Sequence, residues 1–204
     1  MLKLAGEFIE GQLADHIARL DAHTKNPREV FRTGEYMYPF LISFKDISQV
    51  SATADTLYAV PFLVARDMTV DRIAIYVATL AAGKSARLGI YRDGTNLYPG
   101  DLLLDAGEVS VASSGLKAIT IDQALTKGIY WLAIVSDGAP VIRAAAFTVQ
   151  TVLGLGVGFG ATDPQTGWSV SYTYAALPDP FTAGGSFTTQ HNKFLICLRL
   201  KTLD

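Results

Sequence analysis

The chain has 204 residues, of which 50% are hydrophobic and 18% are charged, and its formal net charge is −2. Nucleic-acid-binding domains usually carry a basic face, so this charge argues against a nucleic-acid partner. A monomer of this size would have difficulty hiding so much apolar surface. We therefore expect a homo-oligomer in which sister chains cover part of it.

An amphipathic helix is expected near the N-terminus. Hydrophobic residues recur there at spacings of four, four and three, which places them on one stripe of a helix. They are Ile9, Leu13, Ile17 and Leu20. So short a stripe is not stable alone. We expect it to pack either on the rest of the chain or on copies of itself at an oligomer axis, and the four residues are candidates for the oligomer interface.

A domain boundary is expected near residue 50. The stretch from Lys45 to Thr56 is the part of the chain richest in small and polar residues. We therefore expect an N-terminal helix and extended segment, residues 1–50, that serves attachment or assembly. Residues 51–204 would form a separate domain that folds without it.

Residues 57–137 show the pattern of short β-strands. Apolar side chains occupy every second position in four runs, and breaks rich in Gly, Pro and Asp separate these runs. A period of two places each set on one face of a strand. The sets are Ile73, Ile75 and Val77; Leu88 and Ile90; Ile119 and Ile121; and Tyr130, Leu132 and Ile134. The expected fold is all-β, an antiparallel, jelly-roll-like β-sandwich with a short N-terminal helix.

The C-terminal part contains an apolar stretch from Val141 to Gly160. Arg143, Gln150 and several glycines interrupt it, so we expect a buried strand and a loop with no membrane insertion. A last strand follows, with alternate apolar residues that are expected to share one face and to pair with an early strand. These are Phe194, Ile196, Leu198 and Leu200. The single cysteine, Cys197, excludes an internal disulfide and is expected to be a small buried thiol.

Metal-ligand spacing is missing from the sequence. The three histidines, His16, His23 and His191, are too scattered to predict a metal site. Rings of His16 or His23 around a three-fold axis are the alternative, but solvated polar residues on a helix explain them as well. We expect no metal and no cofactor.

Catalytic patterns are equally weak. No Gly-x-Ser-x-Gly elbow and no phosphate-binding loop occur. Asp93, Asp101 and Asp105 could form a carboxylate pair for glycoside hydrolysis or a calcium site. Their places beside Gly and Pro-Gly turns explain them without such a role. The prediction is a protein that is not an enzyme and has no catalytic residues.

Aromatic residues provide two candidate binding surfaces. Trp168, Tyr172 and Tyr174 share one face of an expected strand, where they would stack on sugars or, as we favour, form core or an oligomer interface. The second surface is a loop end on which tyrosines and hydrogen-bonding side chains are expected to be exposed. It consists of Tyr91, Asp93, Asn96 and Tyr98.

The strand region also carries motifs of a known family. "ARLGIY", "PGDLLLDAG", "ITI" and "GIYWLAIVSDG" occur in this order between residues 86 and 138. With these motifs, the chain from about Leu57 onward resembles a β-sandwich domain of structural proteins in tailed bacteriophages, found in tail fibres, baseplates and minor virion proteins.

The resemblance implies a virion protein, assembled in the host cytoplasm as a homo-oligomer, most often a trimer. It implies contacts with other virion proteins through the N-terminal segment, and it allows attachment to a host surface glycan. It carries no catalytic residues with it. A carbohydrate-binding module is the alternative function, and a hydrolase built on a sandwich is a third.

Overall fold

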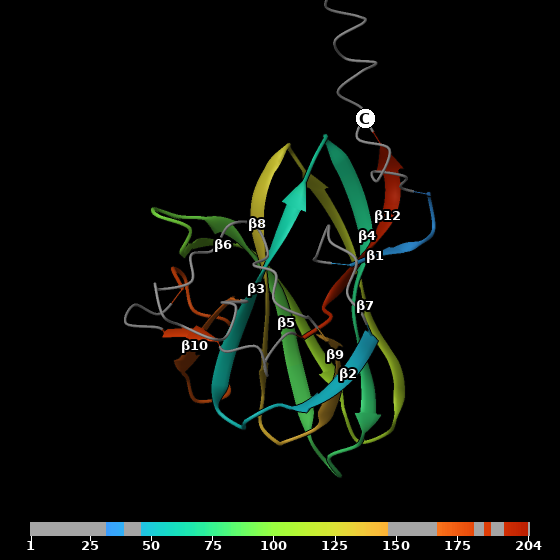
Figure 1. Cartoon of the computed structure of the whole chain (residues 1–204), viewed down its shortest axis with the longest axis vertical. Helices are drawn as coiled ribbons and strands as arrows, with labels where there is room; N and C mark the ends of the chain where they lie inside the picture. Colours follow the sequence, from blue (N-terminus) through green and yellow to red (C-terminus); the bar gives the residue numbers. More distant parts are fainter. Residues whose placement is uncertain (1–31, 39–45, 147–166, 182–185, 189–193, 204) are drawn as a thin grey trace, which may run out of the picture. The chain divides into compact units, whose positions relative to one another are not determined.

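The computed structural model describes residues 32–38, 46–146, 167–181, 186–188 and 194–203 (Figure 1). The chain divides into two compact units, Met1–Phe31 and Arg32–Asp204, and every described residue belongs to the second unit. The expected N-terminal helix therefore lies outside the described residues. The same holds for its candidate interface, Ile9, Leu13, Ile17 and Leu20, and for all three histidines.

The described residues form two antiparallel sheets and contain no helix. The first, sheet I, has the strand order β1-β12-β4-β9-β2, with β7 also paired to β4. Its strands are β1 (Tyr36–Met37), β2 (Asp46–Ser51), β4 (Met68–Thr79), β7 (Gly115–Leu125), β9 (Val141–Ala146) and β12 (Cys197–Leu203). This architecture confirms the all-β, antiparallel sandwich that the alternating pattern predicts.

The second sheet, sheet II, has the order β11-β10-β3-β8-β5-β6. Its strands are β3 (Thr56–Val64), β5 (Ser85–Asp93), β6 (Pro99–Ser110), β8 (Gly128–Ser136), β10 (Gly167–Ser171) and β11 (Ser186–Thr188). Neighbours in this sheet come from distant parts of the sequence, since β3 pairs with both β8 and β10.

The core between the sheets consists of the alternating residues expected from the sequence. Leu88 pairs with Ile134 and Ile90 with Leu132, and all four are essentially inaccessible to solvent. The ring of Tyr58 on β3 meets Phe194 edge-on, with 5.0 Å between ring centroids. Because Phe194 bridges to Ala144 on β9, this contact joins the two sheets.

The last strand behaves as predicted. β12 pairs with β4, an early strand, through Leu198 and Ile73 among others. All four alternate residues that the sequence placed on one face are fully buried: Phe194, Ile196, Leu198 and Leu200. By contrast, Ile119 and Ile121 are only half-buried, because β7 is an edge strand of sheet I.

Sheet II is buried on its outer face as well, which the alternation alone does not indicate. The chain that follows β10 to residue 181 covers this face, and its residues Leu177 and Phe181 pack with residues of sheet II in a second hydrophobic cluster. Gly89 allows the close approach, since a Cβ there would lie 2.2 Å from the Leu177 side chain. The cluster consists of Leu57, Ala59, Tyr91, Trp131, Ala133, Val135, Val170, Leu177 and Phe181.

The expected domain boundary between residues 50 and 51 falls within β2. This strand pairs with β9 from Asp46 to Ser51, and β1 pairs with β12, so the sheets include residues on the N-terminal side of the boundary. The polar composition near residue 50 has a local cause. Gln49 is an exposed residue of β2, and residues 52–55 form the turn into β3.

Of the apolar stretch from residue 141 to 160, the structure describes residues 141–146, which form β9. No helix in the described part of the chain has the length and apolar character needed to cross a membrane.

Candidate functional site

The structure places Tyr91 in the second hydrophobic cluster rather than on the surface. The side chain has no solvent exposure, and its hydroxyl donates a hydrogen bond of 2.9 Å to the backbone oxygen of Pro178. Burial raises the pKa of the phenol above its ordinary value. The prediction of an exposed Tyr91 is therefore wrong. The residue does alternate away from Ile90, but the chain up to Phe181 covers the face it points to.

The other three residues of the predicted loop-end site lie close to this cluster. Asp93 accepts a hydrogen bond of 2.8 Å from the indole nitrogen of the buried Trp131. Asn96 is exposed and has a left-handed backbone, with φ of 57°. Tyr98 is half-buried, and its ring meets those of Trp168 and Phe181 at 4.5 and 5.7 Å. This corner is thus held largely by packing, and Asn96 is its exposed member.

The expected aromatic interface also contacts its own chain. Trp168 is half-buried and donates to the backbone oxygen of Leu97 at 2.8 Å, while the Tyr172 hydroxyl donates to the backbone oxygen of Ala176. Burial, followed by the nearby charge of Glu108, raises the pKa of Tyr174 to about 12. All three aromatic side chains pack against the second hydrophobic cluster.

Two of the three aspartates singled out in the sequence have structural partners. Asp93 holds Trp131, and Asp105 pairs with Arg87 at 3.1 Å and accepts a hydrogen bond from the Leu177 backbone. Asp101 is exposed. Among the described residues, no group of three or more His, Cys, Asp or Glu side chains is arranged to hold a metal ion.

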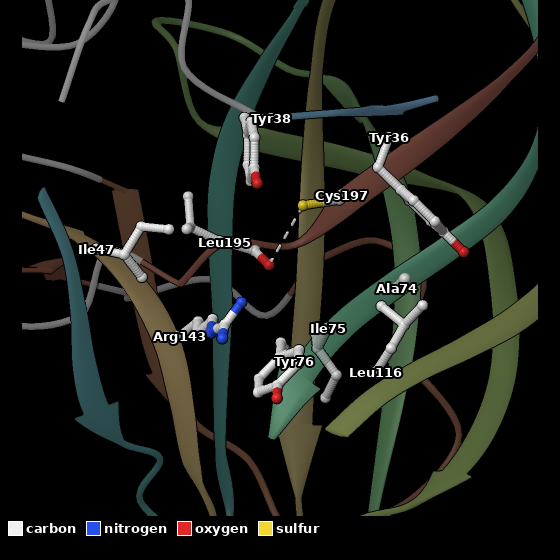
Figure 2. A pocket seen from close by; sticks show the side chains of 10 residues that line it. All are labelled: Tyr36, Tyr38, Ile47, Ala74, Ile75, Tyr76, Leu116, Arg143, Leu195 and Cys197. Carbon is white, nitrogen blue, oxygen red and sulfur yellow. Dashed lines mark hydrogen bonds between the residues drawn. The ribbon is translucent and has the colours of Figure 1, made fainter. Parts of the chain in front are cut away.

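A different site lies on the outer face of sheet I, where the structure forms a hollow of about 130 Å³ (Figure 2). Strand register explains it, because directly paired residues of an antiparallel sheet point to the same face. Cys197 pairs with Ala74, and Tyr76 pairs with Leu116. The hollow is lined by Tyr36, Tyr38, Ile47, Ala74, Ile75, Tyr76, Leu116, Arg143, Leu195 and Cys197.

Exposed hydrophobic side chains gather around this hollow. In the described part of the chain four large hydrophobic residues are exposed, and three of them line the hollow. They are Tyr38, Ile47 and Leu116, with 47%, 43% and 55% of their surface accessible. Exposed hydrophobic residues that gather at one hollow make it a candidate binding surface.

Arg143 gives the hollow its charge. Its guanidinium lies over the ring of Tyr76, 3.6 Å from the ring centroid, as a cation–π contact. Within the described residues no carboxylate forms an ion pair with Arg143. Arg199, on the same sheet, differs because it binds Asp71 through two contacts of 2.8 and 2.7 Å.

Cys197 lies in the middle of the lining in Figure 2, with its thiol directed to the backbone oxygen of Leu195 at 3.7 Å. Burial raises the pKa of this thiol to about 12, so it stays protonated at neutral pH. A neutral thiol is a poor nucleophile. In this hollow Cys197 thus acts as apolar lining.

Sequence reasoning missed this site because its residues come from six strands, and from the chain next to two of them, between residues 36 and 197. The available signals were weak: an apolar connector containing Tyr36 and Tyr38, and one cation, Arg143, inside an apolar stretch. Comparison with known proteins adds no assignment, since no protein-family model and no curated protein matches the chain.

Proposed function

We propose that this protein is a structural protein of a tailed-bacteriophage virion, in a tail fibre, baseplate or head appendage, that presents its jelly-roll-like β-sandwich on the particle surface for host attachment. The motifs between residues 86 and 138 support the phage origin through their resemblance to such domains. The all-β fold fits it.

One observation supports the surface role: the outer face of sheet II is covered by the chain itself, whereas the outer face of sheet I exposes hydrophobic residues. The outer face of sheet II is covered by the chain's own residues up to Phe181. The outer face of sheet I instead exposes Tyr38, Ile47 and Leu116 around a hollow that holds Arg143. A sandwich that seals one face and leaves an apolar, charged hollow on the other is suited to present the second face to a partner.

The assembly part of the proposal rests on composition. With 50% hydrophobic residues against 18% charged ones, the chain is expected to bury surface between copies. A trimer is favoured, with the N-terminal segment contacting other virion proteins, and the virion would assemble in the host cytoplasm.

The experiment has two measurements on the full chain. Light scattering at micromolar concentration should give a multiple of the 21.9 kDa chain mass, and three copies are expected. Mass spectrometry of phage particles purified from the source organism should detect the chain in the particle fraction. A soluble monomer that is absent from purified particles would overturn the proposal.

A second candidate, a carbohydrate-binding module outside any virion, is favoured by the hollow alone. Tyrosines on one concave surface provide apolar ring faces and hydroxyl groups, both of which suit sugars. The particle measurement separates the two, because a free module would bind sugar and yet be absent from virions.

A further inference from the structure

We infer that the hollow on sheet I binds a single sugar ring that carries a carboxylate, such as a uronic acid at the end of a glycan, with Arg143 holding the carboxylate. The inference rests on the proposed attachment role only for its biological setting. The binding itself is argued from the residues of the hollow and can be measured on the isolated protein.

The stacking of Arg143 leaves its hydrogen-bonding edge available. A guanidinium that lies flat on an aromatic ring uses its face, whereas its five N–H donors point outward in the plane of the group. The Cζ atom of Arg143 lies over the Tyr76 ring, 3.6 Å from its centroid, a distance that fits such stacking. Arg143 is half-buried. Its partial burial and its contact with the Tyr76 ring together limit the motion of the guanidinium. A planar fork held in place is the geometry that binds a carboxylate through two parallel hydrogen bonds.

Charge in the hollow calls for an anionic ligand. Arg143 is the cation among the described residues of the lining, and no described lining residue is acidic. A partner that covered this guanidinium with purely apolar surface would have to desolvate an unpaired charge, which is costly. Arg199 does not compete for the ligand in the same way, because its Nε and Nη2 already donate two hydrogen bonds to the carboxylate of Asp71.

The rest of the lining suits a sugar rather than a simple anion. Tyr36, Tyr38 and Tyr76 line the hollow together with Leu116 and Ile47. Figure 2 shows the Tyr38 side chain directed toward Leu195 at the centre of the lining. Tyrosine offers an apolar ring for the C–H face of a sugar and a hydroxyl that both donates and accepts hydrogen bonds. Phosphate or sulfate would leave this apolar surface unused.

Size limits the ligand to about one ring. The hollow has a volume of about 130 Å³. Sites for drug-sized ligands usually measure about 300–1,000 Å³. A terminal or branching residue of a glycan therefore fits better than an extended stretch of it.

The test titrates the full protein with methyl glucuronide and, as the matched neutral probe, methyl glucoside, which has a hydroxymethyl group in place of the carboxylate. Chemical-shift changes in NMR spectra give both dissociation constants. We expect the glucuronide to bind about tenfold more tightly, the scale of one charge-assisted hydrogen-bonded contact. Arg143→Gln should abolish this preference.

Matched variants separate charge, geometry and folding. Arg92→Gln changes the net charge equally, at an exposed residue of β5 in the other sheet, and should leave the preference unchanged. Arg143→Lys keeps the charge but loses the planar fork, so a preference between those of wild type and Arg143→Gln is expected. Thermal melts show whether each variant is folded. If Arg143→Gln does not fold, the lysine variant decides the question.

Several results would overturn the inference. Equal affinity for the two sugars, a preference that persists in folded Arg143→Gln, or an undiminished preference in folded Arg143→Lys would exclude carboxylate recognition by the Arg143 guanidinium. Benzoate binding as tightly as glucuronide, or displacement of glucuronide by an equal concentration of inorganic phosphate, would exclude a sugar site. The wild type could also form an oligomer that the substitution Leu116→Glu breaks apart. If glucuronide then does not bind, this face is a subunit interface and not a sugar site.

The attachment role and the sugar site can fail separately. Absence of the chain from phage particles, with glucuronide binding intact, would overturn the proposed function and leave the sugar site standing. If the chain is present in phage particles but does not bind glucuronide, the sugar site is overturned and the proposed function stands.

Discussion

The hydroxyl of Tyr91 on β5 donates a hydrogen bond of 2.9 Å to the backbone oxygen of Pro178, a residue 87 positions later in the chain. This bond, and the edge-on contact of the Tyr91 and Phe181 rings at 5.3 Å, fasten the covering segment to the outer face of sheet II. The second hydrophobic cluster thus depends on the Tyr91 side chain, which the sequence predicts to be exposed in a binding site at the loop end.

Replacing Tyr91 should therefore change stability rather than binding. Tyr91→Phe removes the hydrogen bond and is expected to cost about 1 kcal/mol of unfolding free energy. Tyr91→Ala also leaves a cavity and should cost about 3–5 kcal/mol. Urea denaturation of both variants measures this. If both variants kept wild-type stability, the assignment of Tyr91 to the core would be untenable.

The second prediction concerns the contribution to stability of the hydrogen bond between the side chains of Trp131 and Asp93. Asp93→Asn retains an oxygen that can accept from the indole N–H at its 2.8 Å position, so a small loss is expected. Asp93→Ala leaves the N–H of a fully buried Trp131 without this acceptor and should cost about 1–3 kcal/mol. Chemical denaturation followed by tryptophan fluorescence compares the two. Equal losses in the two variants would show that the hydrogen bond is unimportant.

Acid should weaken the link between β12 and β4. The hydrogen bonds from Arg199 hold the pKa of Asp71 below its ordinary value of 3.8. A carboxyl group whose pKa is lower in the folded state stabilises the fold fully above that ordinary value. The contribution is lost as pH falls below 3.8 and through the lowered pKa. The effect is expected to be modest, because this partly exposed pair is screened by solvent and salt.

Melting temperatures between pH 6 and pH 2 measure this contribution. Arg199→Gln should be less stable than wild type at pH 6, and the gap should narrow toward pH 2. The difference in melting temperature between wild type and Asp71→Asn should also narrow toward pH 2, because the variant has no carboxyl group at this position to titrate. A gap that is constant over this range would exclude the ion pair as its source.

Truncation tests where the sandwich begins. A chain that starts at Arg32 retains β1 and β2 and should melt cooperatively, since the compact unit begins there. A chain that starts at Ala52 lacks both strands, leaves β9 without its partner from Asp46 to Ser51, and uncovers one side of β12. We expect it to melt at a lower temperature or not to fold. Equal melting of the two chains would place the boundary at residue 50, as the composition predicts.

The sequence predicts the sheets well because a period of two is a local property. Leu88, Ile90, Leu132 and Ile134 are buried where the alternation places them. It also places Tyr91 on the opposite face correctly. What it cannot indicate is whether that face is covered, since the covering residues, such as Leu177, lie far along the chain.

The hollow on sheet I shows the same limit more strongly. Tyr76 and Arg143 are neighbours only because β4 and β9 pair at one end of β4, at Val77 and Ile142. No spacing in the sequence encodes that pairing. The loop-end prediction is wrong for Tyr91 because a side chain that points away from the core is not exposed to solvent in a sandwich whose outer face is covered.

The position of β4 has a consequence for how the protein folds. On one side β4 pairs with β7, which comes after β5 and β6 in the chain. On the other side it pairs with β12, where Arg199 and Asp71 are 128 residues apart. Contacts so distant in sequence slow folding, because a long loop must close before they form. While the chain is being synthesised, β4 has an open edge until β12 emerges. This open edge is where a nascent chain is most exposed to pairing with the wrong strand, including a strand of a neighbouring nascent copy.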